Sequence, residues 1–188
     1  FLKRLVIKNE IITQVTILSL TEFLYDELKE QAFHFESALN EFSCTFLGCV
    51  LYQDNSVFFQ IGDGIIVRND NSGNFTTIWL PQNGEYSNTT TFLIDDIYFG
   101  NLKFKELDEK IDEIALTTDG LQILILNNDT NDIHQPFFLE LFKWLRLANS
   151  PEQIDILGKK LQDYISSDII NDRTDDDKTL ILATRLNA

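Results

Sequence analysis

The sequence predicts an α+β domain, and three observations lead to this class. A long segment with helical spacing lies near the start of the chain, several short apolar runs bounded by turn residues follow it, and two further helical segments precede a closing apolar run. Because short turns join successive strands, we expect them to pair as an antiparallel meander. The length of 188 residues fits one domain, residues 1–188, without a linker or a repeat.

The first segment, residues 13–42, is predicted to be a helix. Apolar side chains recur in it at steps of three and four residues, with acidic and basic side chains between them. Ser19 or Thr21 could cap one of its turns. The apolar positions that form the expected core-facing stripe are Leu20, Phe23, Leu24, Leu28, Phe35 and Leu39.

Strands are expected in the middle of the chain. The continuous apolar run at residues 45–52 predicts a strand that is buried on both faces. The Asp63-Gly64 pair is a hairpin signal between two of the later strands. These later strands are predicted at residues 57–61, 65–68, 75–80 and 92–94.

The last third of the chain mixes strands and helices. Residues 114–118 predict a strand that ends at Asp119-Gly120, and residues 121–126 fit either a helix or a strand. Pro136 begins one helix, and Ser150 followed by Pro151 is typical of the start of another. Residues 179–184 are predicted to form the closing strand.

Composition and charge exclude several classes of protein. A hydrophobic fraction of 44% excludes a disordered chain. Fifteen basic and 30 acidic residues give a net charge of −15, which argues against nucleic acid and membrane surfaces as partners and favours divalent cations. No apolar stretch reaches the roughly 18 residues of a membrane span. Glu10, Thr13 and Gln14 interrupt any signal-peptide core, so we expect a cytoplasmic protein.

The cysteines and histidines do not form a reactive cluster in the sequence. Cys44 and Cys49 lie in one apolar run, and their odd separation would place them on opposite faces of a strand. We expect two buried free thiols in a reducing compartment, without a neighbour that activates either of them. His34 and His134 have no partner at the spacing of metal ligands, so structural or solvated roles are expected.

Three aspartates lie where a predicted strand meets a turn: Asp63, Asp119 and Asp176. If the strands beside Asp119 and Asp176 pair antiparallel, the two carboxylates meet at one edge of the sheet. Two carboxylates at such a short distance repel each other, and a divalent cation bound between them would relieve the repulsion. Each position also has a structural interpretation, as a plain turn at Asp63 and Asp119 and as a solvated acidic loop at residues 175–177.

Taken in order, four short motifs resemble those of the metal-dependent protein phosphatases of the 2C (PPM) family. They are Phe42-Ser43-Cys44-Thr45-Phe46-Leu47, Gln60-Ile61-Gly62-Asp63-Gly64, Leu116-Thr117-Thr118-Asp119-Gly120-Leu121 and Asp176-Asp177-Lys178-Thr179. The longer strings at residues 84–93 and 173–180 resemble a bacterial branch of this family. The order and spacing of the motifs agree from about residue 42 to the end of the chain.

The resemblance implies a fold, a cofactor and an activity. The fold is an antiparallel β-sandwich flanked by helices on both sides, in α-β-β-α layers, with two Mn²⁺ or Mg²⁺ ions at one end. Asp119 and Asp176 would each give a carboxylate to one of these ions, and Asp63 would lie near a weaker third ion. Ile123 occupies the place where the family often has a further Asp. The family removes phosphate from phosphoserine and phosphothreonine in proteins, by attack of a metal-bound hydroxide.

One part of the family pattern has no match in this chain. In the family, an Asp-Gly motif whose Asp bridges the two ions lies ahead of the long helix, as does a basic residue that binds the substrate phosphate. Nothing before Thr13 matches either feature, and Lys3 and Arg4 are poor replacements for the basic residue. Either the family's N-terminal strands are absent from this chain or the protein lacks a complete site. Missing strands would leave a sheet edge and apolar surface exposed, which favours the first explanation.

The sequence therefore predicts a bacterial protein serine/threonine phosphatase of the signalling type that depends on Mn²⁺ or Mg²⁺. Its activity is conditional on the N-terminal segment, and its partners would be phosphoserine and phosphothreonine proteins. One alternative is a phosphatase-like regulatory or binding module without activity. Another is a structural domain stabilised by Ca²⁺, although its acidic loops lack the regular spacing of a dedicated calcium loop. Neither the substrate-binding residues nor the oligomeric state is predicted.

Overall fold

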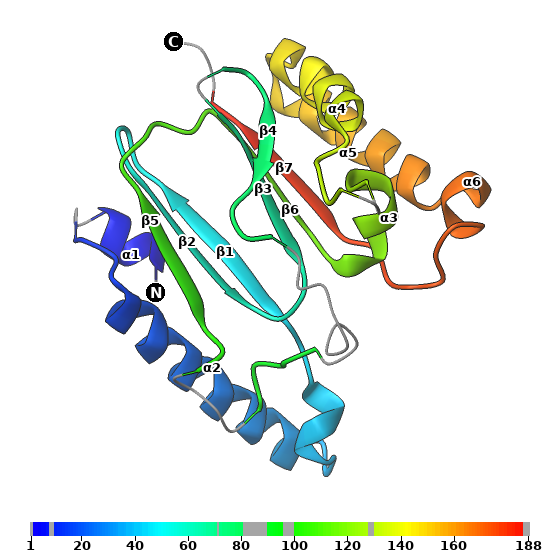
Figure 1. Cartoon of the computed structure of the whole chain (residues 1–188). Coiled ribbons are helices and arrows are strands. Elements are labelled where there is room, and N and C mark those ends of the chain that lie inside the picture. Colours follow the sequence, from blue (N-terminus) through cyan, green and yellow to red (C-terminus); the bar gives the residue numbers. More distant parts are fainter. Residues whose placement is uncertain are drawn as a thin grey trace. The chain divides into compact units, whose positions relative to one another are not determined.

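The structure is a computed structural model that describes residues 2–7, 10–70, 72–80, 90–95, 100–127 and 130–185 (Figure 1). It contains two antiparallel sheets and several helices, which confirms the α+β class. The chain divides into two compact units. The first unit is formed by Phe1–Asp63 and Asn83–Lys110, and the second by Gly64–Gln82 and Ile111–Ala188.

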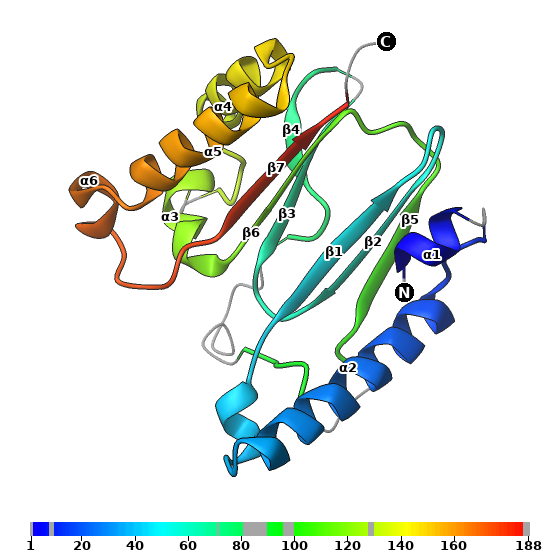
Figure 2. The same ribbon diagram turned by 180° about the vertical axis from the view of Figure 1, so that it is seen from behind.

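The first unit is built on a three-stranded sheet with the strand order β1-β2-β5. Helix α2 runs beside this sheet (Figure 2), and Ile17 on α2 packs into one buried cluster with Val57 and Phe59 on β2. The elements of this unit are α1 (Leu2–Ile7), α2 (Gln14–His34), the 3-10 helix η1 (Leu39–Phe42), β1 (Phe46–Leu51), β2 (Ser56–Ile61) and β5 (Lys103–Leu107).

Helix α2 is shorter than the predicted helix of residues 13–42. Thr13 caps its start, because the Thr13 side chain accepts a hydrogen bond from the Thr16 N–H. The helix ends at His34, and Glu36 adopts a left-handed backbone with φ 53° before η1 begins. The predicted cap at Ser19 or Thr21 is wrong, since Thr21 instead donates a hydrogen bond to the Leu18 carbonyl inside the helix.

The predicted apolar stripe of α2 is buried only in part. Leu20 is buried, whereas Phe23 and Phe35 are exposed. Ile17 and Ala32, which the prediction did not include, are buried. Leu24 and Leu28 of the predicted stripe pack against the core of this unit, so the stripe is confirmed at Leu20, Leu24 and Leu28 and wrong at Phe23 and at Phe35, which follows the end of the helix.

Strand β1 is half-exposed along its length, so the prediction that it is buried on both faces is wrong. In the described part of the chain it stands at the edge of its sheet, whereas β2 lies in the centre and is buried throughout. Cys44 precedes β1 and is exposed, which contradicts its predicted burial. Cys49 lies within β1, and burial raises the pKa of its thiol to about 11.

Two strand predictions around the first sheet are also wrong. Residues 92–94 are not a strand, although Leu93 is buried and its N–H donates a hydrogen bond to the Cys44 carbonyl at 2.8 Å. Asp63-Gly64 does not close a hairpin, because β2 pairs with β5 and the next strand in sequence, β3, belongs to the other sheet. Strand β5 was not predicted, because Lys103, Lys105 and Glu106 interrupt the apolar pattern that would indicate a strand.

The second unit is built on a four-stranded antiparallel sheet with the order β4-β3-β6-β7. Of residues 121–126, which fitted either a helix or a strand, 121–125 are helical and Leu126 forms an isolated β-bridge with Ile133, and β4 is shorter than the predicted strand of residues 75–80. The elements of this unit are β3 (Ile65–Asn69), β4 (Phe75–Thr77), β6 (Glu113–Thr117), η2 (Asp119–Leu121), α3 (Gln122–Ile125), α4 (Gln135–Leu147), α5 (Pro151–Ile165), α6 (Asp168–Asn171) and β7 (Leu180–Thr184).

The core of the second unit joins its sheet to helices α3, α4 and α6. Phe75 on β4 stacks on Phe142 of α4 with 5.2 Å between ring centroids, and Phe138 packs beside them. All three rings are buried, and the burial of each contributes on the order of 2–3 kcal/mol to the free energy of folding. The predicted start of α5 is confirmed, because the Ser150 side chain accepts a hydrogen bond from the Gln153 N–H.

Strands β6 and β7 pair antiparallel, with Thr117 opposite Leu180 (Figures 1 and 2), so the condition set for the two aspartates is met. The carboxyl end of β6 therefore adjoins the start of β7, and this end of the sheet carries the candidate site. Among the described helices, none has the length and apolar character needed to cross a membrane.

Candidate metal centre

A single hydroxyl group connects the two loops that carry Asp119 and Asp176. The Thr118 Oγ1 donates a hydrogen bond to the Asp177 carbonyl at 3.1 Å and accepts one from the Thr179 N–H at 3.0 Å. The Thr118 N–H also donates to the Thr179 carbonyl at 3.2 Å. These bonds extend the pairing of β6 and β7 past the ends of the strands, so the two loops stay together.

Gly120 allows the two loops to approach closely. A Cβ atom built on Gly120 would lie 2.5 Å from the Asp177 carbonyl oxygen and 3.1 Å from the Cβ of Asp176. Any side chain here would push the loops apart, since real Cβ contacts are not shorter than about 3 Å. The Asp176 side chain therefore starts directly beside the residue that follows Asp119.

The loop between α6 and β7 is shaped by its own backbone contacts. The Arg173 N–H donates to the Ile170 carbonyl at 3.0 Å, and the Asp176 N–H donates to Thr174 Oγ1 at 3.2 Å. Ile170 is buried in the core of the second unit. The start of the loop is thus anchored, and residues 173–176 turn toward η2.

Both aspartates line one open pocket of about 300 Å³ at this end of the sheet. Asp119 and Asp176 are exposed, and Ile123, at the place where the family often has an Asp, gives the pocket an apolar wall instead. The full lining consists of Asp119, Gly120, Gln122, Ile123, Arg173, Thr174, Asp175 and Asp176. Within the described residues, no group of three or more His, Cys, Asp or Glu side chains is arranged to hold a metal ion.

Asp63 belongs to the first unit, whereas Asp119 and Asp176 belong to the second. The Thr90 hydroxyl donates a hydrogen bond to the Asp63 carboxylate. Burial lowers the pKa of Lys103, and the charge of Asp63 opposes this shift. The preceding Gly62 has φ +107°, and a Cβ on it would lie 2.4 Å from the Thr45 side chain, so this turn requires glycine.

Thr118, next to the pocket, and Arg173, which lines it, are residues to which the sequence analysis gave no role. Both lie inside quoted strings, Thr118 in the Ser/Thr-Asp-Gly motif and Arg173 in the last string, so their positions could have been found. The two histidines have no ligand-like setting. His134 Nδ1 lies 3.2 Å from the Leu124 carbonyl, and the His34 ring contacts Phe35 edge-on.

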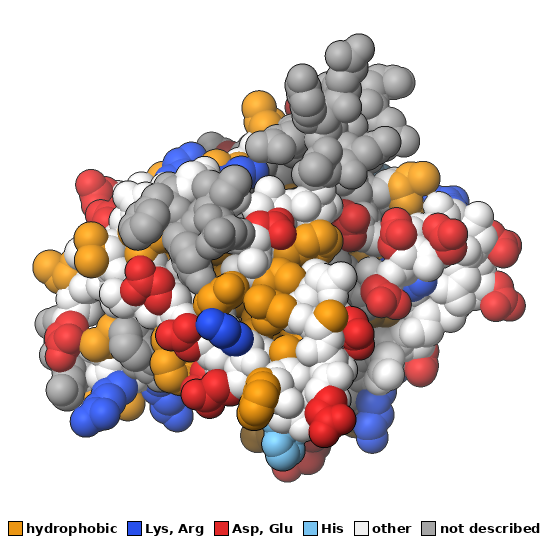
Figure 3. Space-filling view, turned by 90° about the horizontal axis from the view of Figure 1, so that it is seen from below, with side chains coloured by type: hydrophobic (Ala, Val, Ile, Leu, Met, Phe, Trp, Pro, Cys, Tyr) orange, Lys and Arg blue, Asp and Glu red, His pale blue; other side chains and the backbone are white. Residues whose placement is uncertain are grey.

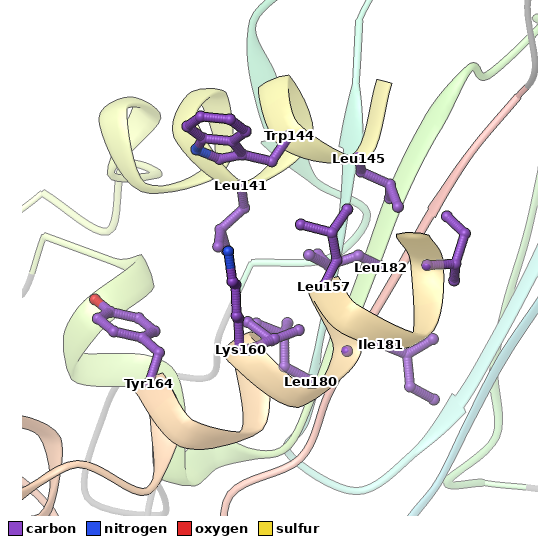
Figure 4. Close-up of a pocket in the computed structure, with 12 residues that line it drawn as sticks. Leu141, Trp144, Leu145, Leu157, Lys160, Tyr164, Leu180, Ile181 and Leu182 are labelled. Carbon is purple, nitrogen blue, oxygen red and sulfur yellow. The ribbon is translucent and has the colours of Figure 1, made fainter. Parts of the chain in front are cut away.

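A larger pocket of the second unit has a different character. It has a volume of about 580 Å³ and is lined by α4, α5 and β7 (Figure 4). Trp144, Leu157 and Tyr164 are among its apolar lining residues, and Lys160 is its charged one. It contains no carboxylate, so it offers no ligand for a hard divalent cation. On the face of the molecule that Figure 3 shows, acidic side chains lie scattered among apolar ones.

Comparison with known proteins identifies the family. A model of the protein phosphatase 2C family matches residues 2–165. The chain belongs to this family. The matched range of this protein phosphatase 2C family member includes Asp63 and Asp119 and stops before Asp176.

Relatives of this protein phosphatase 2C family member include serine/threonine-protein phosphatase 3 of Escherichia coli (strain K12). The two are 36% identical over 175 residues, which cover 93% of this chain and 67% of the relative. The relative is named as a serine/threonine phosphatase, and together with the family match it supports a protein phosphatase.

Solved structures with the same fold have low sequence identity. A bacterial serine phosphatase has a TM-score of 0.52 at 16% identity, covering 95% of this chain and 74% of its own. PppA, described as a key regulatory component of T6SS in Pseudomonas aeruginosa, has a TM-score of 0.54 at 14% identity, covering 90% of this chain and 68% of its own. At this identity the likeness concerns the fold alone, and it agrees with the α+β class with two antiparallel sheets.

Proposed function

We propose that this member of the protein phosphatase 2C family is a metal-dependent serine/threonine phosphatase that acts on phosphoproteins. The observation that carries the proposal is that Asp119 and Asp176, far apart in the sequence, line one open pocket where β6 and β7 meet. The identity of 36% to a serine/threonine-protein phosphatase supports the same activity.

The chemistry of the pocket suits Mn²⁺ or Mg²⁺. Both ions prefer hard oxygen ligands, and exposed aspartate carboxylates are such ligands. In this proposal Asp119 and Asp176 each bind one of two ions, and Asp63 contributes to a weaker third ion. When bound, the two ions supply a hydroxide nucleophile and neutralise the charge of the transferred phosphoryl group.

In this proposal Thr118 and Gly120 position the two aspartates. The Thr118 hydroxyl bonds to the Asp177 carbonyl and the Thr179 N–H, which favours the position of the Asp176 loop beside η2. Gly120 leaves room for the Cβ of Asp176 beside Asp119. The open shape of the pocket admits a phosphorylated side chain that projects from a protein surface.

The proposal also needs a carboxylate that bridges the two ions. The family places it in an Asp-Gly motif ahead of the long helix, and residues 1–13 contain no such motif. The proposed activity therefore depends on a bridging carboxylate that residues 1–13 do not supply. The chain spans about two thirds of the length of its E. coli relative.

Two other functions compete with this proposal. An inactive phosphatase-like module is not favoured, since the matched family and the E. coli relative both carry the name of a phosphatase. A structural domain stabilised by Ca²⁺ predicts that Ca²⁺ raises the melting temperature and that no metal supports hydrolysis.

The test is hydrolysis of p-nitrophenyl phosphate and of a phosphoserine peptide by the full protein with Mn²⁺, Mg²⁺ or Ca²⁺. We expect activity with Mn²⁺ or Mg²⁺. Asp119→Asn and Asp176→Asn should each lower kcat about 100-fold or more, because a lost ligand removes several kcal/mol of transition-state stabilisation. The matched control is Asp155→Asn, which removes one exposed carboxylate from α5 outside the pocket and should leave kcat unchanged. Activity that ignores the metal or both pocket substitutions would contradict the proposal.

A further inference from the structure

Arg173 is the basic residue that lines the pocket with Asp119, Asp175 and Asp176. Its side chain is exposed, and its guanidinium forms no hydrogen bond or ion pair with any residue of the described ranges. A guanidinium beside a group of carboxylates that forms no such bond is available to a ligand.

The other arginines of the second unit that lie near carboxylates are already engaged. Arg146 forms two hydrogen bonds with the Glu113 carboxylate, at 2.5 and 2.7 Å. Arg185 donates to the Ile111 carbonyl at 2.8 Å and lies 3.8 Å from the Asp112 carboxylate. Arg173 differs from both, because among the residues that the structure describes only its backbone N–H has a partner, the Ile170 carbonyl.

The backbone of Arg173 is held in place at the pocket. Its N–H bond to Ile170 continues the turn that ends α6, and Ile170 is 1% exposed within the core. Thr174 then accepts the Asp176 N–H. Arg173 and Asp176 therefore leave one short, anchored loop and face the same pocket.

The electrostatics of the pocket suit an anionic ligand only after cations have bound. Without a cation the three aspartates outnumber Arg173 and repel a phosphate. Divalent ions on Asp119 and Asp176 remove this repulsion and leave the Arg173 guanidinium free. Its planar arrangement of N–H donors matches two oxygens of a phosphate group.

We propose that Arg173 binds the phosphate group of the substrate and orients it over the ions held by Asp119 and Asp176. This role rests on the proposed phosphatase function. It adds a contact to the phosphate from the loop before β7, in the same pocket as the two aspartates, to that of the family's basic residue ahead of the long helix. A purely structural alternative is that Arg173 only offsets the negative charge of residues 175–177.

The experiment compares the full protein with its Arg173→Ala and Arg173→Lys variants. KM for p-nitrophenyl phosphate and the inhibition constant for inorganic phosphate should both rise about tenfold or more in Arg173→Ala, because a charge-assisted bond to the phosphate is lost. Arg173→Lys should recover part of both, since it keeps the charge and loses the paired geometry. Lys159→Ala, which removes an exposed positive charge from α5, is the matched control and should change neither constant.

Two further measurements are independent of the kinetics. One is Mn²⁺ binding, monitored by the electron paramagnetic resonance signal of the free ion, and the other is the melting temperature. In Arg173→Ala, Mn²⁺ affinity should be unchanged or higher, and the melting temperature unchanged. The role of Arg173 would be overturned if the Arg173→Ala protein kept KM and the inhibition constant within twofold of the unmodified values and had a lower melting temperature. This result would leave the phosphatase function intact. An unmodified protein that neither binds Mn²⁺ nor hydrolyses the substrate would overturn both.

Discussion

The two ends of strand β6 carry acidic side chains in opposite settings. At the start of the strand, Glu113 is buried and pairs with Arg146 of α4 through two hydrogen bonds. Just beyond its end, Asp119 is exposed and lines an open pocket with Asp175 and Asp176. A carboxylate matched by a guanidinium stabilises the packing of a helix on a sheet. At the Asp119 end the carboxylates outnumber the single basic residue of the pocket, Arg173, and the proposed cations would offset their charge.

At the Glu113 end of β6 the charged side chains are paired with groups of the protein itself. Its pocket of about 500 Å³ includes two arginines. The Glu113 carboxylate raises the pKa of Arg146 through their hydrogen bond, and Arg185 is held by the Ile111 carbonyl. Two arginines in a pocket are therefore no sign of an anion site when protein groups already satisfy them.

The largest effect that can break this comparison is expected for Arg146→Ala. It leaves the Glu113 carboxylate buried without its partner, which should lower the free energy of unfolding by about 3 kcal/mol. Urea denaturation measures the loss. The kcat of the folded protein should stay unchanged, because the ion pair lies at the other end of the strand from the pocket.

The double variant Glu113→Gln with Arg146→Ala sharpens this test. It removes the buried charge, so it should recover part of the lost stability. If Arg146→Ala lowered kcat as much as Asp119→Asn does, the two ends of β6 would not be functionally distinct.

A smaller effect is expected for Gly120→Ala, at the other end of the strand. The new Cβ would meet the Asp177 carbonyl at 2.5 Å, so the loop that carries Asp176 must shift. We expect Mn²⁺ affinity to fall by about 30-fold, in the range found when a group that orients a metal ligand is disturbed. Equilibrium binding of Mn²⁺ measures it.

The matched control for Gly120→Ala is Gly158→Ala. Gly158 lies within α5, and a Cβ there would meet no atom within 4 Å. This change should stabilise the helix by about 0.5–1 kcal/mol and leave Mn²⁺ affinity unaltered. Equal Mn²⁺ affinity in the Gly120→Ala and Gly158→Ala proteins would show that the close approach of the two loops has no role in metal binding.

The smallest effect is expected for Thr118→Val, which keeps the shape of the side chain and removes its hydroxyl. The Asp177 carbonyl and the Thr179 N–H each lose one hydrogen bond, so Mn²⁺ affinity should fall about tenfold and stability by about 1 kcal/mol. Calorimetry and a melting curve measure the two changes. Thr118→Ser should restore both, and a failure of the serine to do so would argue against a role of the hydroxyl.

Local signals in the sequence predicted much of the second unit. The Ser150-Pro151 pair marked the start of α5, and the apolar spacing after Pro136 marked α4. These features depend on neighbouring residues, since helix caps and periodicity act over a few positions. The antiparallel pairing of β6 with β7 is the condition under which the sequence analysis brought Asp119, which follows β6, close to Asp176, which precedes β7, and the structure meets this condition.

Features that depend on contacts between distant segments were missed. Strand β5 has charged residues at three of its five positions, and it is a strand because β2 offers it a partner. The Asp63-Gly64 pair resembles a hairpin turn, yet β3 finds its partners in another sheet. Cys44 lies in an apolar run and is exposed, since the strand begins only after it.

The sequence by itself determined which aspartates are candidate ligands, because an aspartate within a short motif beside a predicted strand can be recognised from its neighbours. Only the tertiary structure decided that Asp119, Asp176 and Arg173 share one pocket. The physical reason is that the pairing of β6 with β7, the Thr118 hydrogen bonds and the space left by Gly120 bring together two segments that lie far apart along the chain.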